Sequence, residues 1–271
     1  MKAKLNFLLV VALGGLILSG NALAFTLDLG TQITIDDKNQ ASGSWYTTPS
    51  APNVDDHEVE PGMVGSQVWD LEGFFLKGSE LSLSGGYNFE DGEAGFMSGD
   101  IFIDVDGDAI FGDIDRTPSG NGIRTVDNTF GYDYVFDLDF DKKEYTVYSL
   151  DGQSQVKTSF YTANGGSDPW TYDSGGTLKT TGSFGFYSGL DDDSIKDYEF
   201  SGGLGSHYAL TGFNLSFLDP GTAFISHYTM QCGNDNLMGS GTAPVPEPST
   251  LVLLGGGLIG LFMFNRRRKN P

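Results

Sequence analysis

Cysteine, histidine and positive charge are scarce in this 271-residue chain. It has one cysteine, three histidines, and 15 lysines and arginines against 36 acidic residues, for a formal net charge of −21. A lone cysteine excludes an internal disulfide. We expect Cys232 to be a small buried apolar side chain, with a reactive or intermolecular thiol as the alternative. The acidic excess excludes nucleic acid as a partner, because like charges repel, and it favours divalent cations.

Motifs of familiar catalytic chemistry are also absent. The chain has no Gly-x-Ser-x-Gly turn and no Glu-x-Asp-x-x-Glu run, which removes the simplest hydrolase readings. His57-Glu58 begins like a zinc protease motif, but Pro61 stands where the second histidine should be. We therefore expect a protein that is not an enzyme. Paired carboxylates stay open as an alternative, since glycosidase acids need only lie about 5–10 Å apart in the fold.

Long apolar runs occur only at the two ends of the chain. At the N-terminus, two lysines precede an apolar stretch over residues 5–18, and Ala22-Leu23-Ala24 forms a small-residue cleavage site. This pattern predicts a signal peptide over residues 1–24, removed by signal peptidase. A retained membrane helix is the alternative, but the apolar stretch is short and the cleavage site follows it directly.

The other end, residues 244–271, joins three elements: a short polar signature, an uncharged stretch over residues 250–264 and a basic end over residues 266–269. The signature is Pro246, Glu247 and Pro248, and the basic end is Arg266, Arg267, Arg268 and Lys269. A transmembrane helix over 250–264 would be shorter than the usual 20 or so residues, a mismatch that flanking residues and extended arginines can cover. The basic end predicts a cytoplasmic C-terminus with the bulk of the chain outside.

This three-part arrangement resembles the PEP-CTERM tail, a bacterial sorting signal processed by exosortases. The resemblance implies an exported precursor, held transiently in the inner membrane and cut near Pro246–Pro248. It also implies display at the cell surface or in the extracellular matrix. A permanent anchor without processing is the alternative. Three consecutive glycines at 255–257 weaken the helix and favour local unwinding near a protease.

Between the two signals, residues 25–243 show the pattern of strands. Residues 132–140 alternate strictly and predict a half-buried strand, with Tyr132, Tyr134, Phe136, Leu138 and Phe140 on one face. Further strands are predicted at 26–35, 66–76, 80–89, 99–105, 144–150, 156–162, 181–188, 207–218 and 223–231. Long polar loops are predicted at 36–64, 107–130 and 163–179. About ten short strands with Gly, Asn and Asp turns predict an all-β, β-sandwich or jelly-roll-like domain.

Five aspartates in one predicted loop form a candidate metal site. They are Asp104, Asp106, Asp108, Asp113 and Asp115. Carboxylates at alternate positions can converge on calcium, which takes six to eight oxygen ligands. The span matches an EF-hand loop in length, but its glycine is at the fourth position and its last residue is not Glu. We therefore predict a calcium-binding loop after a strand, with a solvated acidic turn as the alternative. The Asp191-Asp192-Asp193 run is a weaker candidate.

Aromatic and histidine side chains supply the other candidates. Four loop aromatics, Trp45, Tyr46, Trp170 and Tyr172, suit either packing or stacking on sugar. His207 and His227 lie in adjacent predicted strands and could meet in space, although ordinary strand histidines are the better reading. The combined prediction is an exported, non-enzymatic surface or matrix protein that binds calcium or extracellular polysaccharide. A carbohydrate-active β-sandwich module or enzyme is the alternative.

Overall fold

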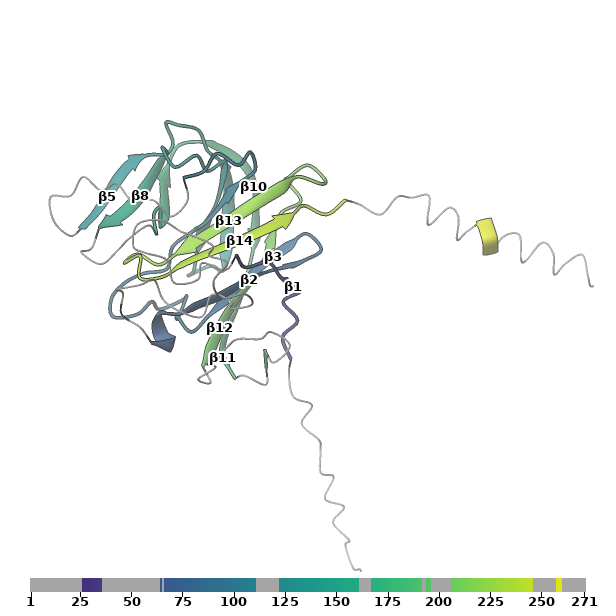
Figure 1. The fold of residues 1–271 in the computed structure, drawn as a ribbon, viewed down its shortest axis with the longest axis horizontal. Helices are drawn as coiled ribbons and strands as arrows, with labels where there is room; N and C mark the ends of the chain where they lie inside the picture. Colours follow the sequence, from purple (N-terminus) through teal and green to yellow (C-terminus); the bar gives the residue numbers. More distant parts are fainter. Residues whose placement is uncertain are drawn as a thin grey trace, which may run out of the picture.

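The protein is all-β in the parts that the computed structural model describes (Figure 1), which are residues 26–35, 64, 66–110, 122–160, 167–191, 194–195, 206–245 and 257–259. Its strands form three antiparallel sheets. The first sheet, in spatial order, comprises β1 (Thr31–Gln32), β2 (Leu71–Lys77), β3 (Glu80–Gly85), β12 (His207–Asn214) and β11 (Gly185–Leu190). The second comprises β10 (Thr177–Ser183), β7 (Glu144–Ser149), β6 (Tyr134–Asp139), β4 (Ile101–Asp104), β13 (Ala223–Thr229) and β14 (Asn236–Thr242). The third comprises β5 (Gly122–Asp127), β8 (Gln155–Phe160) and β9 (Thr171–Ser174).

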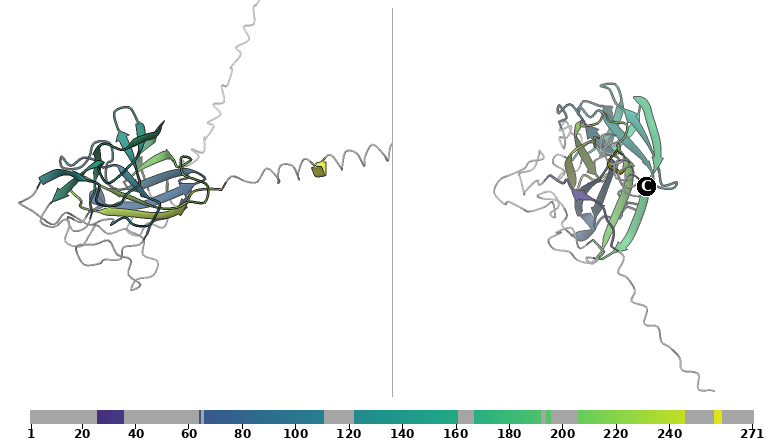
Figure 2. Two further views of the ribbon diagram at one scale, coloured as in Figure 1. Left: turned by 90° about the horizontal axis from the view of Figure 1, so that it is seen from above. Right: turned by 90° about the vertical axis from the view of Figure 1, so that its right-hand side faces the viewer.

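The main core lies between the first and second sheets, as in a β-sandwich. Phe74 from β2 and Phe213 from β12 belong to the same buried cluster as Phe136 from β6 and Tyr228 from β13. Aromatic rings meet across this core at favourable angles, for example Phe136 and Phe213 with centroids 5.7 Å apart. Two further views of the same arrangement are given in Figure 2. The predicted all-β fold is confirmed.

The outer faces of both large sheets are also covered. In β4, Ile101 and Ile103 enter the main core, while Phe102 packs in a second cluster against the third sheet. Phe75 of β2 likewise points away from its neighbour Phe74 into a third cluster, with Leu27 and Leu29 of the N-terminal segment. Successive strand residues point to opposite faces, so a strand apolar at consecutive positions is buried on both sides.

The predicted strand at 132–140 is observed as β6, with one correction. Phe136 lies in the main core, and Tyr134, Leu138 and Phe140 pack against it from partly buried positions. Tyr132 precedes β6 and belongs instead to the cluster under the third sheet, together with Val135. The period-two pattern does not extend to residue 132, because Tyr132 lies before the start of β6 at Tyr134 and packs in the other cluster.

The predicted strand at 181–188 is in fact two strands in different sheets. β10 ends at Ser183 in the second sheet, and β11 begins at Gly185 in the first. Phe184 between them is buried in the main core, and its amide donates to the carbonyl of Lys143. The chain therefore crosses from one layer to the other without a polar turn, which is why the sequence pattern gives no sign of it.

Three strands contradict the predicted loops and turns. β5 falls within the predicted loop 107–130, β9 falls within the predicted loop 163–179, and β14 lies beyond the last predicted strand at 223–231. β5 and β10 are exposed at many positions and polar in sequence, because each lies at an edge of its sheet. The predicted 26–35 strand contributes only the two-residue β1 and a bridge from Thr34 to Gly239.

The expected membrane segment at 250–264 lies almost wholly outside the described residues. Residues 257–259 are helical. Within the described part of the chain, no helix has the length and apolar character needed to cross a bilayer. The signal peptide over residues 1–24 also lies outside the described residues, and both segments stay predictions.

Candidate functional site

The aspartate loop follows β4 directly and curls around one buried carboxylate. Asp104 is 1% exposed, whereas Asp106 and Asp108 are exposed. Oδ1 of Asp104 accepts the amides of Asp106 at 3.1 Å and Gly107 at 2.8 Å. Gly107 has a φ of +81°, a left-handed conformation that glycine adopts without strain. One carboxylate oxygen from each of the three aspartates can be chosen so that all lie within 4.8 Å of one another.

Two buried oxygen atoms in this region have no hydrogen-bond partner among the described residues. They are Oδ2 of Asp104 and the hydroxyl of Tyr132, and both side chains are almost fully buried. Burial, with the charge of Asp104 as a second cause, raises the pKa of Tyr132. A buried carboxylate oxygen without a partner costs free energy unless a cation or donor compensates it. Among the described residues, no donor therefore compensates Oδ2 of Asp104 at the buried end of the loop.

A fourth carboxylate, Asp133, completes the acidic cluster. Its Oδ2 accepts the amide of Val105 at 2.7 Å, which ties the start of β6 to the loop. Burial raises the pKa of Asp133, and the nearby charges of the three loop aspartates raise it further. The pKa of Asp108 is raised mainly by the charge of Asp106. Three of these mutually repelling carboxylates, those of Asp104, Asp106 and Asp108, can converge on one divalent cation, with Asp133 close enough for their charges to raise its pKa.

In the sequence, Asp133 falls within the predicted strand at 132–140 and has no mark of a candidate ligand. The signal that could have identified it is the pairing of β4 with β6, in which Ile103 is opposite Tyr134. Asp113 and Asp115 lie outside the described residues, as do Asp192 and Asp193. Asp191 is described, and its Oδ1 accepts from the amide and hydroxyl of Ser194 at 2.9 and 2.7 Å, as in a turn cap.

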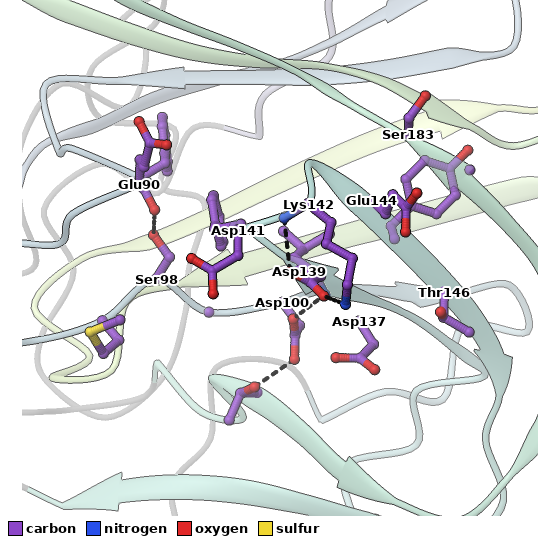
Figure 3. Close-up of a pocket in the computed structure, with 18 of the residues that line it drawn as sticks. Glu90, Ser98, Asp100, Asp137, Asp139, Asp141, Lys142, Glu144, Thr146 and Ser183 are labelled. Atoms are coloured by element: carbon purple, nitrogen blue, oxygen red, sulfur yellow. Dashed lines mark hydrogen bonds and ion pairs between the residues drawn. The ribbon is translucent and has the colours of Figure 1, made fainter.

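A second acidic feature is a groove of about 900 Å³ beside β6, β7 and β10. Six carboxyl side chains and one lysine line it: Glu90, Asp100, Asp137, Asp139, Asp141, Glu144 and Lys142. Figure 3 shows Asp100, Asp137 and Asp139 gathered near its centre, with Glu144 and Ser183 toward one end. Hydroxyl groups from Ser98, Thr146, Thr171, Thr181 and Ser183 also line the groove. The groove is therefore both acidic and rich in hydrogen-bonding groups.

The two central carboxyl groups of the groove have different environments. Asp100 is 3% exposed, and its oxygens accept from the amides of Leu138 and Tyr172, at 2.9 and 2.8 Å, and from the hydroxyl of Thr171 at 2.5 Å. Burial raises the pKa of Asp100 to about 7, and the charge of Asp137 adds to this rise. Asp137 is half-buried, and burial raises its pKa as well. Asp100 therefore joins three strands, while Asp137 faces the groove.

Two lysines neutralise part of the groove's rim. Lys142 pairs with Asp139, and Lys143 pairs with Glu90. Within the described residues, no ion pair involves Asp137, Asp141 or Glu144. The groove therefore keeps a negative excess on its floor and along one side.

The loop aromatics do not form a described sugar-stacking platform. Trp170 is 8% exposed, so its ring is covered by protein. Tyr172 stacks on Tyr148 with centroids 4.8 Å apart, and its hydroxyl donates to the carbonyl of Gly175. For these two residues, packing is the better description. Trp45 and Tyr46 lie outside the described residues.

The histidines do not meet, contrary to the alternative left open by the sequence. His207 is on β12 of the first sheet and His227 is on β13 of the second. Nδ1 of His207 lies 2.5 Å from Oε1 of Glu72, and both side chains are buried. Nε2 of His227 lies 3.0 Å from the carbonyl oxygen of Pro169. Each histidine is a buried strand residue with its own partner. His57 lies outside the described residues.

Cys232 is 8% exposed and belongs to the main core. Burial raises the pKa of its thiol to about 11. These observations agree with the predicted small buried side chain and oppose a reactive thiol.

The described domain ends close to the predicted processing signature. Both backbone groups of Ala243 are hydrogen-bonded: its amide donates to the carbonyl of Thr222 at 2.8 Å, and its carbonyl accepts from the amide of Gly221 at 2.9 Å. Ala243 is buried and Val245 is 67% exposed. The remaining sorting and processing residues, Ala22, Ala24, Pro246, Glu247, Pro248, Arg266, Arg267 and Arg268, lie outside the described residues.

The fold and these features define a class of protein: an all-β domain with an acidic surface, followed directly by a short C-terminal tail. The PEP-CTERM protein-sorting motif matches residues 244–269, so the chain carries this motif. The match confirms the resemblance and supports a substrate of exosortase that is exported through a membrane-anchored precursor. No curated protein and no solved structure matches the chain.

Proposed function

We propose that the protein is exported, processed at both ends, and displayed or released as a non-enzymatic surface or matrix protein. The observation that carries the proposal is the sorting motif at residues 244–269, which begins one residue after the last buried residue of the domain. Signal peptidase and exosortase are its proposed processing partners. The inner membrane is a transient partner through the tail.

Intact mass and N-terminal sequencing of the extracellular form test the proposed processing. The expected product begins at Phe25 and ends near Pro246–Pro248. A mass that still includes the basic end at 266–269 would contradict cleavage and leave a permanent anchor. An N-terminus at Met1 would contradict removal of the signal peptide.

We further propose that the ectodomain binds calcium through Asp104, Asp106 and Asp108, with Asp133 beside them. The support is the convergence of the three carboxylates within 4.8 Å and the partnerless buried oxygen of Asp104. Calcium prefers oxygen ligands and tolerates irregular geometry, which suits carboxylates from a turn and a neighbouring strand. Asp113 and Asp115 are also proposed ligands on the grounds of sequence spacing alone.

Thermal unfolding of residues 25–245 with calcium and with chelator tests the calcium site. This range contains every buried residue of the described domain, from Leu27 to Ala243. A ligand at 100 times its dissociation constant stabilises the folded state by about 2.7 kcal/mol, which raises the midpoint by roughly 5–10 °C for a domain of this size. Asp106→Asn should abolish most of this rise, whereas the exposed Asp219→Asn should keep it. An unchanged wild-type midpoint would show that the loop is only an acidic turn.

Binding of extracellular polysaccharide is a second candidate function, and the acidic, hydroxyl-lined groove favours it. Asp100 is a poor candidate for a catalytic acid or base in this groove, because it is buried and its carboxyl group is committed to three donors. A glycosidase needs two carboxyl groups that both reach the substrate. A glycan array and a hydrolysis assay on residues 25–245 test this candidate. Turnover would indicate the carbohydrate-active enzyme instead.

A further inference from the structure

The charge of the acidic groove indicates which class of polysaccharide it would bind, if the second candidate function is correct. Six carboxyl groups and one lysine line it, and Asp137, Asp141 and Glu144 have no ion pair within the described residues. A concave site lined by one sign of charge concentrates ligands of the opposite sign. A neutral glycan can donate only uncharged hydroxyl hydrogen bonds to these carboxylates, and an acidic glycan is repelled by them, so neither neutralises their charge. The complementary ligand therefore carries positive charge.

The positive charge is not that of a single metal ion. Among the described residues, the carboxylates that can converge on one ion are those of Asp104, Asp106 and Asp108, outside the groove. The groove's acids are instead distributed along its length, with Glu90 and Glu144 toward different ends in Figure 3. A distributed row of acids matches a ligand with several separate cationic groups, each able to donate a charge-assisted hydrogen bond to its own carboxylate.

The size and remaining lining of the groove favour a sugar chain over a simple polyamine. A volume of about 900 Å³ is within the range of about 300–1,000 Å³ for ligand sites of small-molecule size. Serine and threonine hydroxyls lie beside the carboxyl groups, from Ser98, Thr146, Thr171, Thr181 and Ser183. Those of Ser98 and Thr171 already donate to the carbonyl of Phe89 and to Asp100. Hydroxyls that both donate and accept suit a ligand with many hydroxyls of its own. Phe140, which is partly buried, supplies an apolar wall.

We propose that this groove binds amino-sugar polysaccharide whose amino groups are free and protonated. The inference rests on the proposed polysaccharide-binding function and adds the chemical class of the ligand. Asp137, Asp141 and Glu144 bind the ammonium groups. The hydroxyls of Thr146 and Ser183 bind the sugar hydroxyls. Asp100 supports the site from behind by holding the backbone of Leu138 and Tyr172 in place.

Isothermal titration of residues 25–245 with chitosan oligosaccharides tests the proposal. The controls are N-acetylated oligosaccharides of the same length, cello-oligosaccharides and spermine. We expect saturable binding of the chitosan series and binding at least tenfold weaker of both uncharged series, since one lost charge-assisted hydrogen bond is worth about tenfold in affinity. Raising the salt from about 50 to 500 mM should weaken the binding, because screening acts on exposed charges.

The matched variants are Asp137→Asn with Glu144→Gln in the groove, and Asp219→Asn outside it. The groove variant should lose at least about tenfold in chitosan affinity, and the Asp219 variant should keep wild-type affinity, with circular dichroism confirming that both are folded. Equal binding of the uncharged series would overturn the amino-sugar inference and leave polysaccharide binding intact. Spermine binding as tight as chitosan binding would overturn the sugar as the ligand. Failure to bind any saccharide would overturn both the inference and the function on which it rests.

Discussion

The ring of His227 is stacked on the ring of Tyr132, with centroids 5.4 Å apart and planes inclined by 22°. Tyr132 in turn approaches the buried carboxylate of Asp104, whose charge contributes to raising the tyrosine pKa. The side chain of Tyr132 therefore lies between the buried, neutral imidazole of His227 and the acidic loop. Nε2 of His227 carries the hydrogen, because the carbonyl oxygen of Pro169 can only accept.

The first prediction concerns acid sensitivity from His227. Burial lowers its pKa from 6.5 to about 4. Between these values the unfolded chain binds a proton that the folded protein does not, so stability falls as the pH drops through this window and is unaffected above it. The full contribution is about 3 kcal/mol. Denaturant unfolding from neutral pH down to the acid limit, on wild type and His227→Phe, measures it.

The variant should lose less stability on acidification than the wild type, although it starts lower because the carbonyl of Pro169 loses its donor. Asp100 titrates in the opposite sense, since its pKa is raised to about 7 and its burial favours the protonated form. Asp100 is present in both proteins. The difference between the pH dependence of stability in the wild type and in His227→Phe therefore isolates the contribution of His227. Identical slopes would refute the prediction.

The second prediction concerns Gly131, which faces the acidic loop. Gly131 has a φ of +86°, and a Cβ there would lie 2.6 Å from Oδ1 of Asp108. Gly131→Ala should therefore destabilise the domain by about 1–2 kcal/mol, through backbone strain and displacement of Asp108. It should also weaken calcium binding, which would reduce the calcium-dependent rise of the unfolding midpoint. Gly152→Ala is the matched control, because nothing lies within 4 Å of a Cβ there. A normal calcium affinity in Gly131→Ala would remove Asp108 from the ligand set.

The third prediction concerns the buried pair of His207 and Glu72. Their strands, β12 and β2, are separated by β3, and Nε2 of Gln67 also donates to Glu72 at 2.7 Å. His207→Phe should cost about 3 kcal/mol or more, because it leaves a buried carboxylate without its main partner. The double variant with Glu72→Met should recover most of this loss. Chemical denaturation measures both, and a double variant no more stable than the single one would contradict the account.

The fourth prediction concerns the reactivity of Cys232. Burial raises its pKa from 9.0 to about 11. At mildly alkaline pH the folded protein should therefore contain about a hundredfold less thiolate than the unfolded chain, and should react correspondingly slowly with a disulfide reagent. The same reaction in concentrated guanidinium chloride is the control. Fast labelling of the folded protein would show an accessible thiol and reopen intermolecular pairing.

Local patterns were enough to predict most of the fold. Residues 144–150 and 223–231 contain the observed β7 and β13, because alternation reports burial on one face of a strand. The same reasoning missed β5 and β9 and found only the last residues of β10, since these edge strands need no apolar face. It also missed the switch of sheets at Phe184, because a chain that crosses between layers inside the core stays apolar.

The candidate sites also have a part that the sequence predicts and a part that it does not. Asp104, Asp106 and Asp108 could be found from their spacing, because a single turn brings alternate carboxylates together. Asp133 could not, since only the pairing of β4 with β6 carries it to the loop. The groove was beyond prediction for the same reason: Asp100, Asp137 and Glu144 come from separate segments that are joined by the second sheet.

The sequence by itself determined the sorting tail, the all-β class and the acidic loop, because each depends on residues close together in the chain. Only the tertiary structure decided which acids share a site and which histidines stay apart. Strand order in a sheet is set by packing of the whole core, in which Phe136, Phe213 and Tyr228 from distant strands must be buried together. That packing is a collective property of many weak contacts, and no short stretch of sequence encodes it.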